Sequence, residues 1–115
     1  MAHLLNLDRR LCSQAESLRR GEWRRAEYSE ARGLFGQTLA VLGVGHIGRE
    51  VVLRAKAFGM EVRVWSRSLT PEAALEMGAT WCRSPESAVD GAYALAVHLP
   101  LTEETKGLVG ADLLE

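Results

Sequence analysis

Three glycines at positions 43, 45 and 48 form the pattern in this sequence that is best suited to chemistry, because GVGHIG fits G-x-G-x-x-G. The pattern follows a short apolar run and precedes a segment of helical periodicity, which is the context in which it binds a dinucleotide phosphate. Gly43 would allow the tight turn, Gly45 would leave room for a pyrophosphate, and Gly48 would let helix and strand pack closely. Free N–H groups at the helix start would meet the phosphates. A glycine-rich turn without a ligand is the alternative.

The turn after the second expected strand bears on which dinucleotide would bind. Sites that prefer NAD place an acidic residue about 20 positions after the glycines, where it binds the ribose hydroxyls. Here that position is Ser66, followed by Arg67 and Ser68. One cation and two hydroxyls suit a ribose 2′-phosphate, which slightly favours NADP over NAD. Alternatively, Arg67 is a solvated turn residue and either cofactor binds.

The segment before the glycine pattern is expected to hold one helix and a connection. Apolar residues recur at three- and four-residue spacing from residue 2 to residue 20, and Gly21 follows as a stop signal. This predicts a single leading helix over 1–21. Residues 22–37 lack periodicity and predict an extended connection with three aromatic anchors, Trp23, Tyr28 and Phe35.

Residues 38–115 alternate strand and helix signals. Strands are expected at 38–43, 61–66, 79–82 and 93–99. The helix after the glycines is expected to turn one apolar face to the sheet and to end at Gly59, with Glu50 and Arg54 paired on the other face. That apolar face comprises Ile47, Val51, Ala55 and Phe58. Thr70 and Ser84, each followed by proline, predict two further helix starts. The order predicts an α/β fold with a Rossmann-type, doubly wound parallel sheet, of which the first four strands are present.

Composition limits the classes of function. The chain has 115 residues, 47% apolar and 25% charged, with a net charge of −1. These values predict one globular domain and argue against nucleic acid or an anionic membrane as partner. No apolar run reaches the length of a membrane span, and no basic segment precedes the first leucines as in a signal peptide. Cys12 and Cys82 lack metal-ligand spacing, which predicts reduced thiols in the cytoplasm and no metal site.

Three ordered segments, residues 33–62, 68–79 and 96–110, make the sequence similar to the cofactor-binding domain of the D-isomer-specific 2-hydroxyacid dehydrogenases. The last of these reads AVHLPLTEETKGLVG. The resemblance implies an oxidoreductase that transfers a hydride between a nicotinamide cofactor and a D-2-hydroxy acid or 2-keto acid. It also implies a set of cofactor-binding residues: Gly43, Gly45, His46, Ile47 and Gly48 at the pyrophosphate, Ser66, Arg67 and Ser68 at the adenosine ribose, Leu99 and Pro100 beside the adenosine, and Thr105 near the cofactor. His98 is expected to have a structural or cofactor-side role.

The resemblance also implies what these residues do not supply. The family's catalytic arginine, acid and histidine are expected downstream and its substrate lobe upstream, so no catalytic residue is assigned here. The leading helix with Trp23, Arg24 and Arg25 is expected to form a homodimer surface. Two alternatives remain. A methyltransferase also uses a glycine turn, but normally has an acid where Ser66 stands, and a non-catalytic dinucleotide-binding or dimerisation module needs no chemistry at all.

Overall fold

The computed structural model describes residues 1–114 and contains two compact units, Met1–Phe35 and Gly36–Glu115. The second unit is built on one sheet of four parallel strands in the order β3-β2-β1-β4. The strands are β1 Thr38–Leu42, β2 Glu61–Trp65, β3 Thr80–Trp81 and β4 Ala94–Val97. This is the order of the first four strands of a Rossmann sheet, so the predicted α/β class and parallel topology are confirmed.

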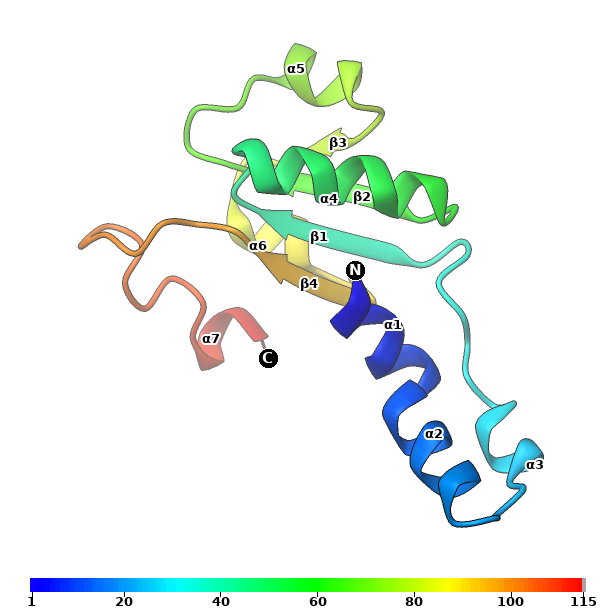
Figure 1. The fold of residues 1–115 in the computed structure, drawn as a ribbon. Coiled ribbons are helices and arrows are strands. Elements are labelled where there is room, and N and C mark those ends of the chain that lie inside the picture. Colours follow the sequence, from blue (N-terminus) through cyan, green and yellow to red (C-terminus); the bar gives the residue numbers. More distant parts are fainter. Residues whose placement is uncertain (115) are drawn as a thin grey trace. The chain divides into compact units, whose positions relative to one another are not determined.

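Helices cover both faces of this sheet (Figure 1). They are α4 His46–Ala57, α5 Pro71–Glu76, α6 Pro85–Val89 and α7 Ala111–Leu114. Helix α4 lies against one face and α6 against the other. A sheet covered in this way requires apolar residues on both sides of its central strand.

Strand β1 meets that requirement along almost its whole length. Its residues 39–42 are at most 1% exposed. Ala40 and Leu42 pack with Cys82 and Ala88 on the α6 side. Leu39 and Val41 project to the opposite face, because successive side chains of a strand alternate. The core of this unit therefore lies on both sides of β1 and holds the end of that strand in place.

The predicted helix starts are confirmed. The Thr70 hydroxyl accepts a hydrogen bond from the N–H of Ala73 at 3.2 Å. Ser84 forms a reciprocal capping box with Ser87, and Pro71 and Pro85 occupy the first turns. Observed strands are shorter than expected at their ends. In β4 the ladder stops at Val97 because its partner in β1, Leu42, is the last residue of that strand.

Of the apolar face expected for α4, only Ala55 is buried, and Val51 is half-buried. Gly48, Val52 and Ala55 are buried, whereas Ile47 and Phe58 are 69% and 43% exposed. The helix is rotated about its axis relative to the expected orientation, because Gly48, which has no side chain, packs against the backbone of the glycine turn. The pairing of Arg54 with Glu50 is confirmed. This rotation leaves Ile47, in the first turn of the helix, exposed to solvent.

The first unit contains three short helices where one long helix and a connection were expected. They are α1 Ala2–Arg9, α2 Leu11–Arg19 and α3 Arg25–Tyr28. The single-helix prediction is wrong because Arg10 adopts a left-handed conformation, with φ 50° and ψ 44°. The Asn6 side chain accepts a hydrogen bond from the N–H of Cys12 at 2.9 Å and so satisfies one of the free N–H groups at the start of the second helix. Apolar spacing continues across this break and did not reveal it.

Of the three expected aromatic anchors in residues 22–37, only Tyr28 is partly buried. Its hydroxyl lies 3.1 Å from the Ser17 hydroxyl, and the Arg10 guanidinium lies over its ring. Trp23 and Phe35 are 76% and 85% exposed, so their predicted anchoring role is wrong. Among the described residues no helix has the length and hydropathy that crossing a membrane would require.

Candidate functional site

The loops that follow β1, β2 and β4 leave the sheet at the same edge, because the three strands are parallel and adjacent. Figure 1 shows the arrowheads of β1 and β4 at this edge, with the start of α4 beside them. From β1 the chain proceeds to β2 and β3 on one side and then returns to β4 on the other. Such a reversal leaves a crevice outside the carboxyl ends of the strands, where open α/β sheets bind ligands.

The glycine turn, residues 43–45, connects the end of β1 to the start of α4 at this edge. Its first residue, Gly43, has to be glycine for two reasons. Its φ is +94°, a conformation that residues with a Cβ rarely adopt. A Cβ on Gly43 would also lie 2.7 Å from the backbone carbon and oxygen of His98. Gly43 thus allows the end of β1 and the loop after β4 to touch, a contact between segments far apart in the sequence.

Gly48 is required by packing between the helix and the strand. A Cβ there would lie 2.2 Å from the carbonyl oxygen of Gly43. No side chain fits at that distance, so the first turn of α4 sits directly on the glycine turn. This confirms the contact that the glycine pattern predicts between helix and strand.

Gly45 differs from Gly43 and Gly48, because neither its backbone conformation nor its contacts within the described residues require a glycine. Its φ is −80°, and a Cβ there would have no atom within 4 Å among the described residues. The space beside Gly45 is therefore open, and a side chain would project into it. A pyrophosphate group fits this feature, since it needs close approach to the backbone.

The start of α4 provides the hydrogen-bond donors for such a group. Gly45 is the N-cap residue and carries no side chain to bond the first N–H groups, and the first turn contains no acidic residue. His46 and Ile47 are exposed on this turn. The free N–H groups and the helix dipole of a twelve-residue helix favour an anion here.

The turn after β2 lies next to the glycine turn. The Gly43 N–H donates to the carbonyl of Trp65 at 2.8 Å, so the turn that starts at Ser66 lies beside Gly43. The N–H of Leu69 donates to the Ser66 carbonyl at 3.2 Å and closes the turn. Ser66 is half-buried, while Arg67 and Ser68 are exposed. The Arg67 guanidinium is paired with the carboxylate of Glu104.

The loop after β4 carries the remaining predicted residues. Leu99 packs against the core cluster on the α6 side, and Pro100 is exposed. The His98 N–H donates to the carbonyl of Leu42 at 2.8 Å, while its buried Nε2 has no hydrogen-bond partner within residues 1–114. The Thr105 hydroxyl bonds within its own loop, accepting from the N–H of Thr102 at 2.9 Å. His98 and Thr105 thus both help to hold the loop, and a cofactor contact for Thr105 stays a prediction.

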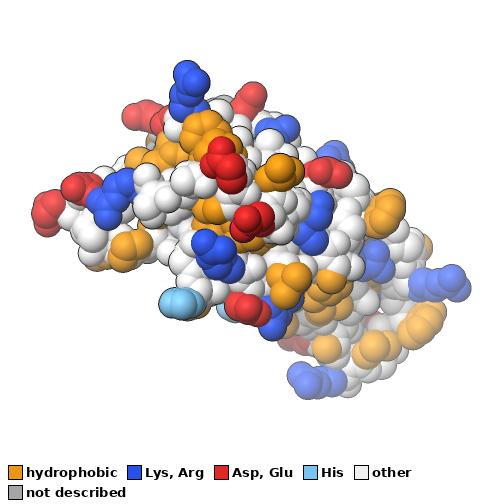
Figure 2. All heavy atoms as spheres, turned by 90° about the horizontal axis from the view of Figure 1, so that it is seen from above, with side chains coloured by type: hydrophobic (Ala, Val, Ile, Leu, Met, Phe, Trp, Pro, Cys, Tyr) orange, Lys and Arg blue, Asp and Glu red, His pale blue; other side chains and the backbone are white. Residues whose placement is uncertain are grey.

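Basic, acidic and apolar side chains are intermixed over the face shown in Figure 2. The positive features at the strand ends are the start of α4 and the Arg67 guanidinium.

Burial raises the pKa of the Cys82 thiol, which therefore stays protonated in the core. In the described part of the chain no three His, Cys, Asp or Glu side chains are grouped as metal ligands.

Sequence reasoning missed one charged residue of this region, Glu104. It lies in the loop after β4, whereas Arg67 lies after β2. No spacing rule links the two positions, because only the strand order brings their loops together. Two glutamates stand in this loop, at positions 103 and 104, and the sequence did not indicate which of them would face Arg67.

Comparisons with known proteins agree with this geometry. The family described as D-isomer specific 2-hydroxyacid dehydrogenase, NAD binding domain, matches residues 1–115. D-3-phosphoglycerate dehydrogenase of Bacillus subtilis is 41% identical over 98 residues, which cover 85% of this chain and 18% of that protein. Glyoxylate reductase of Thermococcus litoralis is 36% identical over 120 residues, which cover 99% of this chain and 36% of the relative.

A solved structure is similar over the same extent. A crystal structure of a putative D-3-phosphoglycerate dehydrogenase oxidoreductase from Ralstonia solanacearum matches with a TM-score of 0.85 at 31% identity. The match covers 98% of this chain and 36% of that one. The chain therefore spans between about a fifth and about a third of the length of these proteins.

Proposed function

Because the chain belongs to the D-isomer specific 2-hydroxyacid dehydrogenase family through its NAD binding domain, we propose that its second unit binds a nicotinamide dinucleotide for an oxidoreductase. Gly45 carries this proposal. Gly43 and Gly48 are explained by backbone contacts within the protein, whereas no atom of residues 1–114 lies within 4 Å of a Cβ placed on Gly45. A ligand phosphate accounts for glycine at that position.

The proposed placement of the cofactor follows the three loops at the strand ends. Backbone N–H groups from His46 to Gly48 would bind the pyrophosphate at the start of α4. Ser66, Arg67 and Ser68 would surround the adenosine ribose. Leu99 and Pro100 would flank the adenosine, with Thr105 near the cofactor. The bound nicotinamide would supply the hydride donor or acceptor that this chain's own side chains lack.

The proposed reaction of the whole protein interconverts a D-2-hydroxy acid and a 2-keto acid. Support comes from the family match and from relatives named for phosphoglycerate and glyoxylate. We assign no catalytic residue to residues 1–114. The methyltransferase alternative expects an acid at the end of β2, where Ser66 stands, and it has no support from the family match. A cytoplasmic setting is proposed because Cys12 and Cys82 are both free thiols.

Titration of the full-length protein with NADPH and with NADH, followed by fluorescence, tests cofactor binding. Saturable binding of at least one is expected. Gly45→Ala should weaken binding roughly tenfold or more, since its methyl group occupies the proposed phosphate position, while stability falls by about 1 kcal/mol at most. Gly110→Ala adds the same methyl group in ordinary contact with the backbone and is the matched control. Absence of saturable binding by either cofactor in the unaltered protein would sink the proposal.

Preference for NADP(H) over NAD(H) is proposed to be slight. Arg67 offers a charge-assisted contact to a 2′-phosphate, and the turn has no carboxylate at Ser66 for the bare hydroxyls. Ser66→Asp should shift relative affinity toward NADH by about tenfold, because the new carboxylate repels a phosphate and accepts from hydroxyls. Unchanged relative affinity would refute this account of the turn.

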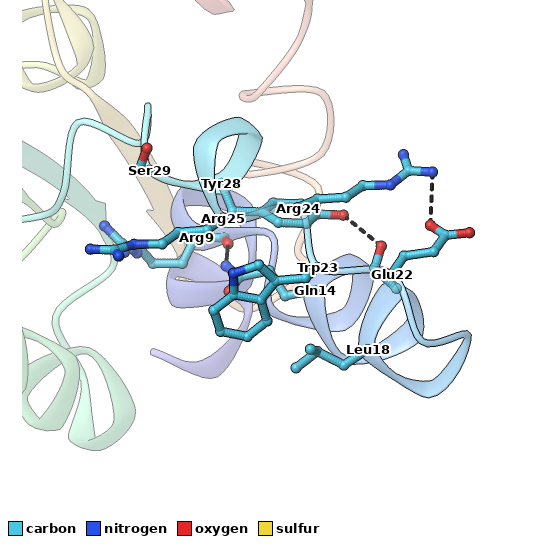
Figure 3. Close-up of a pocket in the computed structure, with 10 residues that line it drawn as sticks. Arg9, Gln14, Leu18, Glu22, Trp23, Arg24, Arg25, Tyr28 and Ser29 are labelled. Carbon is cyan, nitrogen blue, oxygen red and sulfur yellow. Dashed lines mark hydrogen bonds and ion pairs between the residues drawn. The ribbon is translucent and has the colours of Figure 1, made fainter.

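A second proposal concerns the first unit, which we propose forms a homodimer surface. Leu18 and Trp23 are 55% and 76% exposed and line a hollow of about 330 Å³ together with arginines 9, 24 and 25 (Figure 3). None of the residues in α1, α2 or α3 is buried. Amphipathic helices need cover for their apolar side, and a second copy would provide it in a self-complementary way.

Sedimentation of the full-length protein at two concentrations tests the dimer. Trp23→Ser should weaken association about thirtyfold or more if the indole is a central anchor, because such anchors carry about 2 kcal/mol or more. Phe35→Ser removes an even more exposed ring outside the hollow and serves as a control. A protein that sediments as a strict monomer at both concentrations contradicts the proposal.

A further inference from the structure

An ion pair joins two of the loops at the carboxyl edge of the sheet. The Arg67 guanidinium, in the turn after β2, is paired with the Glu104 carboxylate, in the loop after β4. Strands β2 and β4 lie on opposite sides of β1. The pair therefore connects the loops on either side of the strand that leads into the glycine turn. Both side chains remain largely exposed, at 72% and 69%, so solvent and ligands can reach them.

The loop that carries Glu104 is held by its own hydrogen bonds. The two threonines that bracket the glutamates bond each other: the Thr102 N–H donates to the Thr105 hydroxyl at 2.9 Å, and the Thr105 N–H donates to the Thr102 carbonyl at 3.2 Å. The Lys106 N–H also donates to the Thr102 carbonyl, at 2.9 Å. This turn presents Glu103 and Glu104 at adjacent positions, and only Glu104 is ion-paired within residues 1–114. Position within a closed turn, rather than charge alone, selects the partner of Arg67.

The turn that carries Arg67 is fixed in the same manner. The N–H of Leu69 closes it by donating to the Ser66 carbonyl, and the indole N–H of Trp81 donates to the Leu69 carbonyl at 3.0 Å. Both ends of the ion pair thus start from backbones with defined positions. Because the backbone on each side is already held, pairing costs side-chain freedom but little further backbone freedom.

We propose that Glu104 is a specificity-determining residue that limits the preference for NADP(H) by occupying Arg67. The inference rests on the proposed cofactor site at Ser66 to Ser68. A 2′-phosphate must compete with the Glu104 carboxylate for the Arg67 guanidinium. Bare ribose hydroxyls do not need the guanidinium and so face no such competition. Glu104 therefore partly takes the role of the acid that is missing at the end of β2, although it comes from a different loop.

Glu104→Gln in the full-length protein tests this role, with NADPH and NADH dissociation constants as the readout. The ratio of NADPH to NADH affinity should rise about three- to tenfold, because Arg67 becomes free for the phosphate. Adenosine 2′,5′-bisphosphate and 5′-AMP, which differ in the 2′-phosphate and lack the nicotinamide, should show the same shift. Stability should change little, since an exposed ion pair contributes little to folding.

Glu103→Gln is the matched control, because it removes the same charge from the adjacent position of the same turn. Its effect on the ratio should stay below about twofold, as expected for a screened charge without direct contact. In an Arg67→Gln background, Glu104→Gln should no longer raise the ratio. This second comparison separates action through Arg67 from simple repulsion of the phosphate.

The outcomes separate the two levels of the argument. If neither cofactor binds the unaltered protein, the proposed function fails and the inference fails with it. If both bind but Glu104→Gln changes the ratio no more than Glu103→Gln does, the proposed function stands and the role of Glu104 is overturned. A shift that persists without Arg67 also overturns it, because the guanidinium would then not be the site of competition.

Discussion

The two units of this chain differ most in what covers their apolar residues. In the second unit, residues 39–42 of β1 are at most 1% exposed and are packed from both faces of the sheet. In the first unit, helices α1, α2 and α3 contain no buried residue, and Leu7, Leu18 and Trp23 are more than half exposed. One unit supplies its own core and positions a site. The other leaves several large apolar side chains exposed to solvent.

The largest expected effect comes from removing core volume next to the site. Leu42→Ala should lower the free energy of unfolding by about 2–5 kcal/mol, since Leu42 is fully buried at the end of β1. Leu18→Ala, at a 55% exposed position of the first unit, should cost about 0.5 kcal/mol or less in dilute protein. Urea unfolding of both variants measures the contrast. Equal losses would mean that Leu18 is covered in solution, as the proposed dimer would require.

A somewhat smaller effect is expected from overfilling the contact between helix and strand. Gly48→Ala should cost about 1–3 kcal/mol, because its Cβ would meet the Gly43 carbonyl oxygen and the backbone must shift. Gly21, in the first unit, has no atom within 4 Å of a Cβ, so Gly21→Ala carries only the strain of its positive φ. Thermal unfolding should rank Gly48→Ala as the less stable variant. The reverse order would contradict the packing described for α4.

The smallest effect concerns the two thiols, one in each unit. Cys12 is exposed, whereas Cys82 is buried and burial raises the pKa of its thiol. A maleimide at neutral pH should therefore label Cys12 about tenfold or more faster than Cys82.

Because the folded pKa of Cys82 is raised, its contribution to stability is present below the unfolded pKa and is lost as pH rises above it. Stability should thus decline in the alkaline range, and Cys82→Ala should flatten that decline.

Much of the second unit could be predicted because its signals are local. Thr70 and Ser84 cap helices through atoms only three residues away, so these contacts depend on residues that are close together along the chain. The glycine pattern placed the turn between β1 and α4 for the same reason. In the first unit the prediction failed at Arg10, whose left-handed conformation goes with a side-chain contact from Asn6 that apolar spacing does not encode.

In the candidate site, too, some features could be predicted from the sequence and others could not. Residue types at positions 43, 45 and 48 predicted a phosphate site, and the steric contacts of Gly43 and Gly48 explain two of the three glycines. The buried face of α4 was predicted correctly at Ala55 and wrongly at Ile47 and Phe58. Both of those residues are apolar, but the close approach of Gly48 to Gly43 sets the rotation of the helix. Packing against a fixed backbone outweighs the apolar periodicity of one helix.

By itself the sequence determined the class of fold, the glycine turn and the helix starts, because these depend on residues close together along the chain. Only the tertiary structure decided that His98 lies against Gly43, that Gly45 faces open space, and that Arg67 meets Glu104. Those contacts join the ends of different strands, and their existence depends on the order β3-β2-β1-β4. Strand order results from packing of the whole sheet and its helices, which no local pattern specifies.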